Sequence, residues 1–163
     1  TEQKILNVHI GELYVGKKGQ ILRAILGSCV GIGFIWEEKN ICGLAHCLLP
    51  EAPNTSFNIS ARYVTQAIPS LIALMKIRPT DIPDIKAVVV GGGDMTGNNP
   101  ENRDKLVGAI NSRTALKLLH ERKIKIIHQD FGGTEGRQII INCDNFSYQV
   151  RKIPRNSIKP GVL

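Results

Sequence analysis

The sequence predicts an α+β or layered α/β domain, built on a mixed, largely antiparallel sheet with two helices. Three observations predict it: short strand-like apolar runs dominate, only two segments suit amphipathic helices, and the order is several strands, helix, strand, helix, three strands. With 163 residues the chain is long enough to bury a core of its own. We expect one domain over residues 1–153 and a C-terminal tail over residues 154–163.

Each predicted strand is a short run rich in apolar and β-branched residues, which is the composition typical of strands. In chain order the runs are Ile5–Ile10, Ile21–Leu26, Val30–Trp36, Ile41–Leu48, Ile85–Val90, Ile124–Gln129, Gln138–Asn142 and Phe146–Ile153.

The two predicted helices lie between these runs. The first spans about Ile59–Lys76, with Asn58 and Ser60 as candidate caps and with Pro69 expected to kink it. The second spans about Asn102–Lys123. Its predicted apolar stripe consists of Leu106, Ile110, Leu118 and Leu119.

Two of the strand-like runs read as one β-hairpin. Val30–Trp36 and Ile41–Leu48 flank the polar segment Glu37–Asn40. A turn of two residues and a turn of all four give the same register, in which Trp36 faces Ile41. The register decides which side chains share a face, because side chains alternate along each strand.

A cysteine and a histidine meet in this register. Gly31 faces His46, and Cys29 lies two residues beyond Gly31, so Cys29 and His46 are diagonal neighbours, roughly 7–8 Å apart at the backbone. Gly31 and Gly33 leave a gap on that face, where a ligand or another backbone can approach. Histidine can take the thiol proton and later protonate a departing amine, so the pair predicts Cys–His catalysis. The alternative is that Cys29 is a small buried hydrophobic residue.

A zinc site is the rival interpretation of the same hairpin, because thiolates and imidazoles bind zinc. Cys42, His46 and Cys47 lie close together in the sequence. Adjacent strand residues point to opposite faces, however, and Cys42 lies roughly 13 Å along the strand from His46. We therefore expect no metal and no cofactor.

Two glycine-rich segments need separate interpretation. Gly91–Gly93 follows a strand, as in dinucleotide sites, but Asn98–Pro100 separates it from the next helix. We interpret it as a tight loop beside the active site. Asp130–Arg137 is adequately explained as a hairpin loop in which glycines supply positive φ angles.

The chain is basic, with a formal net charge of +7, which indicates a partner that carries negative charge. The basic residues are scattered and only 5% of residues are aromatic, which disfavours nucleic-acid binding. A basic surface that meets an acidic protein explains the same charge. We see no export signal and no membrane-length apolar run, so we expect a cytoplasmic protein without membrane insertion. Its four cysteines are then reduced thiols.

These motifs together resemble the CheD family of bacterial chemoreceptor glutamine deamidases. The resemblance rests on LGSCVG at Leu26–Gly31, GLAHCLLP at Gly43–Pro50 and GGG at Gly91–Gly93. It continues with Val107-Gly108, Asn111, Asp130, Gly132-Gly133 and Gly136-Arg137. The blocks follow the family order and span about Ile5 to Ile153.

The resemblance implies a cysteine amidohydrolase with a fold similar to the catalytic domain of cytotoxic necrotizing factor toxins. It implies Cys29 as the nucleophile and His46 as the general base and acid. The implied substrate is a glutamine side chain on the cytoplasmic coiled coil of a methyl-accepting chemotaxis receptor, which becomes glutamate. The implied partner is a CheC-like phosphatase, which docks on the deamidase and inhibits it.

The chain departs from the family pattern at two positions. Arg23 stands six residues before Cys29, where the family commonly has a threonine, and Ile110 stands where it often has an arginine. Arg23 is a candidate anchor for an acidic patch on the substrate. It also keeps open a second interpretation, a catalytically weak or inactive member that acts as a binding regulator of a CheC-like phosphatase.

Overall fold

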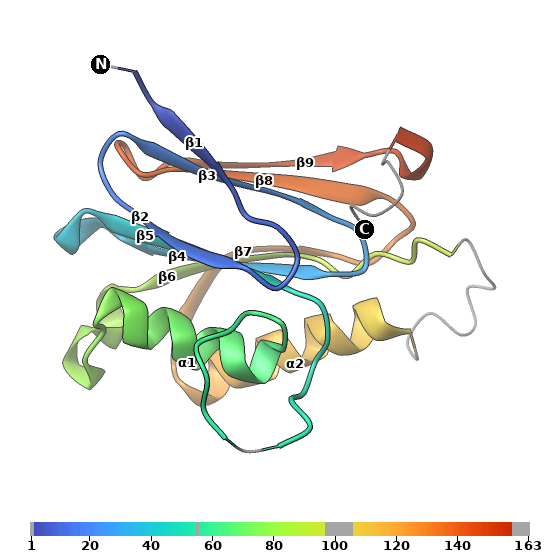
Figure 1. Cartoon of the computed structure of the whole chain (residues 1–163), viewed down its shortest axis with the longest axis horizontal. Helices are drawn as coiled ribbons and strands as arrows, with labels where there is room; N and C mark the ends of the chain where they lie inside the picture. The colour runs from blue at the N-terminus through green and yellow to red at the C-terminus, as the bar shows by residue number, and fades with distance from the viewer. Residues whose placement is uncertain (1, 55, 97–105, 158–163) are drawn as a thin grey trace.

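The computed structural model describes residues 2–54, 56–96 and 106–157. These form three layers: a four-stranded sheet, a five-stranded sheet, and a pair of helices on the outer face of the five-stranded sheet (Figure 1). No helix in the described ranges is long and apolar enough to cross a membrane.

The four-stranded sheet has the order β1 (Lys4–Asn7), β3 (Gln20–Leu26), β8 (Gly136–Asn142) and β9 (Tyr148–Ile153). The five-stranded sheet has the order β2 (Leu13–Gly16), β5 (Ile41–Cys47), β4 (Val30–Trp36), β6 (Lys86–Gly91) and β7 (Lys125–Phe131). The helices are α1 (Val64–Met75) and α2 (Val107–Glu121). Three short 3₁₀ turns complete the described elements: Glu37–Lys39, Pro79–Asp84 and Arg155–Ser157.

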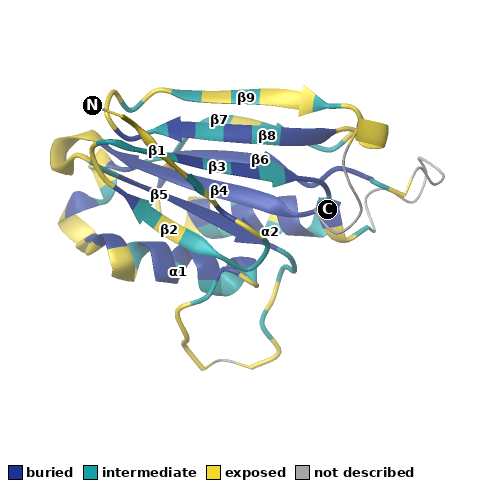
Figure 2. Ribbon diagram, turned by 45° about the horizontal axis from the view of Figure 1, so that its top comes forward, coloured by how far each residue is buried: buried dark blue, intermediate teal, exposed yellow. Residues whose placement is uncertain are grey.

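The α+β class and the mixed, largely antiparallel pairing are confirmed. β1 pairs with β3 in parallel and β6 with β7 in parallel, whereas the other neighbours are antiparallel. The expectation of one sheet is wrong, because the strands divide between two. β4 and most of β5 and β6 are buried on both faces, since the other sheet covers one face and the helices the other (Figure 2). One apolar cluster therefore lies between the sheets and another under the helices.

α1 begins later than its apolar pattern predicts. α2 begins at Val107, and the first residues of the predicted second helix, 102–105, lie outside the described residues. α1 begins after Tyr63, which makes no side-chain cap, and it contains Pro69. The buried face of α2 differs from the predicted leucine and isoleucine stripe. It consists of Gly108, Asn111, Ser112, Ala115 and Leu119. These are mostly small residues because the first turns of α2 pack against the backbone of Gly91–Gly93, called the glycine loop below. A Cβ on Gly108 would lie 2.8 Å from the Gly92 carbonyl.

The first and seventh strands each lead into the other sheet. The predicted run Ile5–Ile10 ends as a strand at Asn7, and residues 8–12 cross to β2, a short strand that the periodicity missed. The prediction of a hairpin loop at Asp130–Arg137 is wrong, because β7 and β8 belong to different sheets and are not paired with each other. Gly132 and Gly133 in this segment do take positive φ angles, of 80° and 66°.

Candidate active site

The β4–β5 hairpin has the register on which the cysteine–histidine argument depends. Trp36 pairs with Ile41 and Gly31 pairs with His46. The connection is a 3₁₀ turn closed by Asn40 in the left-handed conformation, at φ 57°. Because side chains alternate, His46 faces the four-stranded sheet. Cys29 immediately precedes β4 and belongs to the apolar cluster between the two sheets, so the two side chains share this side of the sheet.

The two glycines of β4 do not leave the gap expected beside His46. A Cβ on Gly31 would lie 2.8 Å from a methyl carbon of Leu26, and one on Gly33 would lie 2.6 Å from the Cδ1 of Ile141. Both side chains come from the four-stranded sheet. The glycines therefore let the two sheets approach each other. Of the two alternatives that the sequence leaves open, close approach of another strand is confirmed and space for a ligand is wrong.

His46 is held in a defined tautomer. The side chain is only 2% exposed, and its Nδ1 lies 2.9 Å from the backbone oxygen of Val8. A carbonyl only accepts hydrogen bonds, so Nδ1 carries the proton and donates. Burial lowers the pKa of His46, which favours the neutral ring. Nε2 is then the unprotonated nitrogen, and within the described residues it has no hydrogen-bond partner. This is the arrangement of a general base.

Cys29 is fully buried. Burial raises the pKa of its thiol to about 11, and a hydrogen bond from its own backbone N–H acts in the opposite direction. The thiol is therefore protonated at neutral pH. It makes no hydrogen bond to His46 Nε2. Burial thus favours the neutral forms of the thiol and the imidazole, and no hydrogen bond within the described residues joins the two side chains.

The bend that carries Cys29 is fixed by three consecutive carbonyl groups. The Gly27 oxygen accepts from Gly93 N at 3.0 Å, and the Cys29 oxygen accepts from Gly92 N at 2.9 Å. Between them, the Ser28 oxygen accepts from Asn111 Nδ2 at 3.3 Å. The glycine loop therefore lies beside the Cys29 bend, as its sequence predicts. Gly92 has φ 64°, and a Cβ there would lie 2.1 Å from Ser112 Oγ, so this approach requires glycine.

Asn111 connects the two halves of the site. Its fully buried amide nitrogen also donates to the Leu48 oxygen at 3.0 Å, two residues beyond His46. One side chain of α2 therefore ties the bend before Cys29 to the end of the strand that carries His46. A sequence motif includes Asn111, but helix periodicity alone gives no reason to expect a buried amide there.

We expect Asn111→Ala to lower the free energy of unfolding by about 1–3 kcal/mol, because it removes the buried amide that donates to two partly buried carbonyl groups. Lys117→Ala, on the exposed side of the same helix, should change it by less than about 0.5 kcal/mol. Urea denaturation measures both. Equal stability of the two variants would show that the Asn111 amide holds nothing in place.

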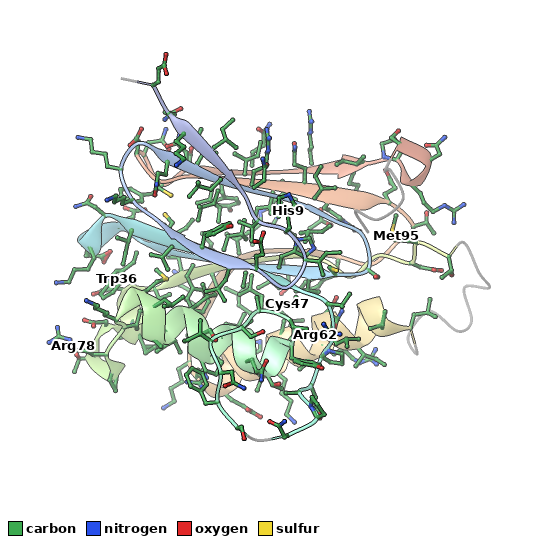
Figure 3. The ribbon with its side chains drawn as sticks, in the orientation of Figure 1. His9, Trp36, Cys47, Arg62, Arg78 and Met95 are labelled. Carbon is green, nitrogen blue, oxygen red and sulfur yellow. The ribbon has the colours of Figure 1, made fainter. Side chains whose placement is uncertain are left out.

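A pocket of about 410 Å³ lies over His46. It is lined by Asn7, Val8, His9, Ile10, Arg23, Ala24, Ile25 and His46. His9, which Figure 3 labels, is on the chain segment that leaves β1. Cys29 is not among the lining residues, so the pocket reaches the histidine of the pair and not the thiol.

The other candidate ligands of a zinc site do not gather around His46. Cys47 packs in the cluster between the five-stranded sheet and the helices (Figure 3). It therefore points to the opposite face of β5 from its neighbour His46. Cys42 lies on the same face as His46, but its thiol is hydrogen-bonded to that of Cys143. All four cysteines are buried and in no disulfide.

A buried arginine, which sequence patterns did not single out chemically, supports the glycine loops. Arg137 is 2% exposed, pairs with Asp130 at 3.2 Å, and donates to the backbone oxygens of Gly132 and Glu135. The Gly133 oxygen in turn accepts from Asp94 N at 2.8 Å. The Asp130 and Arg137 motif positions are thus structural supports of the loops next to the Cys29 bend.

Comparison with known proteins gives one consistent family. The model of the family CheD, described as CheD chemotactic sensory transduction, matches residues 48–152. A protein of Ruegeria sp. (strain TM1040) named "Probable chemoreceptor glutamine deamidase CheD 2" is 36% identical over 95% of this chain and 96% of its own length. A protein of Bdellovibrio bacteriovorus named "Probable chemoreceptor glutamine deamidase CheD" is 34% identical over 93% of this chain and 96% of its own.

Among solved structures, Bacillus licheniformis hypothetical protein YfiH aligns with 79% of this chain and 59% of its own, at 13% identity and a TM-score of 0.39. That likeness is too low to establish a shared fold. The family model and the curated relatives, in contrast, cover the hairpin, the glycine loop and α2 between them. The chain belongs to the CheD family.

Proposed function

We propose that this protein is a protein-glutamine deamidase that converts glutamine side chains of chemoreceptors to glutamate through a thioester on Cys29. The names of its relatives support the substrate and the reaction. The observation that carries the mechanism is the position of His46 on the same side of the hairpin as Cys29, with Nδ1 donating to the Val8 oxygen and Nε2 left without a hydrogen-bond partner among the described residues.

The proposed reaction begins with attack of the Cys29 sulfur on the amide carbon as the thiol proton passes to His46 Nε2. The negative charge that develops on the amide oxygen is stabilised by backbone N–H groups, among them the N–H of Cys29. In the substrate-free structure this N–H is hydrogen-bonded to the thiol of the same residue. The C–N bond breaks and His46 returns the proton to the leaving nitrogen as ammonia. Water, activated by His46, then hydrolyses the thioester to glutamate and regenerates the thiol.

Because Cys29 is fully buried and lies outside the pocket, this proposal requires the site to open when the substrate binds. The role of the Asn111 and glycine-loop contacts is then to keep the bend fixed while the side chains above it move. The CheC-like phosphatase partner and the cytoplasmic location are proposals that rest on the family resemblance.

Alkylation of Cys29 tests the state of the thiol. With a pKa of about 11, only about one thiol in ten thousand is ionised at neutral pH. We expect slow reaction with iodoacetamide at pH 7, and a rate that rises about tenfold per pH unit until the pH approaches 11. Mass spectrometry of the Cys29 peptide measures it, with urea-unfolded protein as the control. Rapid alkylation at pH 7 would show an activated thiolate and contradict this description.

A receptor fragment separates the deamidase from the alternative, a regulator that binds but does not turn over. The deamidase releases ammonia from the fragment and leaves glutamate in place of glutamine. A protein that binds a CheC-like phosphatase but releases no ammonia from any receptor fragment would be the regulator.

A further inference from the structure

Arg23 is one of the residues that line the pocket over His46. Its lining comes from the end of β1 and the segment that follows it (residues 7–10), from residues 23–25 of β3, and from His46 of β5. Val8, Ile10, Ala24 and Ile25 make most of the lining apolar. The described lining residues include no carboxylate. Glu12, in the neighbouring segment, is already hydrogen-bonded to His9 and Tyr14.

The guanidinium of Arg23 is oriented by a hydrogen bond, but no carboxylate in the described part of the chain is paired with it. Its Nε donates to Asn7 Oδ1 at 2.9 Å, which fixes the plane of the guanidinium. No salt bridge in the described part of the chain involves Arg23, so its two terminal nitrogens keep donors for a planar anion. Arg23 lines the pocket from the outer face of the four-stranded sheet. A guanidinium fixed there with free terminal nitrogens is suited to a carboxylate, which it can bind with two parallel hydrogen bonds.

We propose that Arg23 and this pocket form a substrate subsite that binds a carboxylate side chain flanking the target glutamine. The proposal rests on the deamidase function proposed above. Cys29 does not line the pocket, so the pocket receives a neighbour of the scissile amide and not the amide itself. His46 lines the pocket and lies on the same side of the five-stranded sheet as Cys29. A carboxylate bound in the pocket would therefore belong to a residue near the glutamine whose amide reacts with Cys29. Arg23 is therefore a specificity-determining residue.

The probe is an alanine-rich peptide with one glutamine and, three or four residues to either side, glutamate, alanine or lysine. Side chains at these spacings are neighbours on a helix. We expect wild-type protein to prefer the best glutamate peptide over its alanine counterpart at least about tenfold in kcat/KM, mainly through KM. Arg23→Met should lose this preference. Arg23→Glu should reverse it in favour of lysine.

Arg151→Met is the matched control. Arg151 is exposed and pairs with Gln138 on the same outer face of the four-stranded sheet as Arg23, but it lies outside the pocket. It should keep the preference for glutamate. An equal loss in Arg151→Met and Arg23→Met would overturn the subsite in favour of a diffuse basic surface.

Binding of the same labelled peptides to Cys29→Ala, measured by fluorescence anisotropy, separates the two proposals. Preference for glutamate in binding, lost in Cys29→Ala/Arg23→Met, supports the subsite even if the wild type releases no ammonia, in which case only the deamidase fails. Ammonia release without preference for glutamate at any spacing overturns the subsite and leaves the deamidase standing. Binding without that preference also overturns the subsite, whether or not ammonia is released.

Discussion

Replacing Cys29 by alanine is expected to reduce ammonia release by at least about ten-thousand-fold, because no other group in the proposed mechanism forms the covalent intermediate. The side chain is buried and small, so alanine should keep the fold. Ammonia release from a receptor fragment, with circular dichroism as a check on folding, measures the effect.

Cys47→Ala is the matched control for this substitution. Cys47 is also fully buried, and it pairs with Val30 directly beside Cys29, but it faces the helices and not the four-stranded sheet. It should keep most of the activity. Activity in folded Cys29→Ala, or equal loss in both variants, would remove Cys29 from the role of nucleophile.

Replacing His46 by asparagine is expected to lower kcat by about 10²–10⁴-fold. The asparagine amide can still donate to the Val8 oxygen, as Nδ1 does, but it offers no base in place of Nε2. The substitution therefore separates the structural hydrogen bond from proton transfer. A variant that is destabilised but retains the wild-type kcat would make His46 a structural residue only.

The pH dependence of kcat/KM is a second test of His46 as the general base. Burial lowers the pKa of His46, so the ring stays neutral, and able to accept a proton, to a lower pH than an exposed histidine would. In the wild type kcat/KM should stay constant down to the ordinary histidine pKa and fall only in more acidic solution. This acid limb should be absent from the residual activity of His46→Asn.

The register of the β4–β5 hairpin could be predicted from the sequence alone. The register of Val30–Trp36 against Ile41–Cys47 followed from strand-like runs of matching length and one polar turn, and the structure has it residue for residue. A one-residue slip would have placed His46 among the helix-facing core residues. Local patterns suffice here because the pairing partner is the next strand along the chain.

The surroundings of that hairpin depend on contacts between distant segments, which local patterns do not contain. Nothing near Gly31 and Gly33 indicates that Leu26 and Ile141 fill the space above them. The division into two sheets and the crossing of residues 130–137 were missed for the same reason. Likewise, the partner of His46 Nδ1 is the backbone of Val8, which lies on a segment that the sequence assigned to a longer strand.

The deamidase proposal is tested most directly by the reaction itself, run with wild-type protein on the cytoplasmic fragment of a chemoreceptor in ¹⁸O-labelled water. The thioester mechanism predicts ammonia release that matches the number of glutamines converted, with one solvent oxygen in each new glutamate carboxylate. Folded protein that releases no ammonia from any of several receptor fragments, and leaves every glutamine unlabelled, would contradict it.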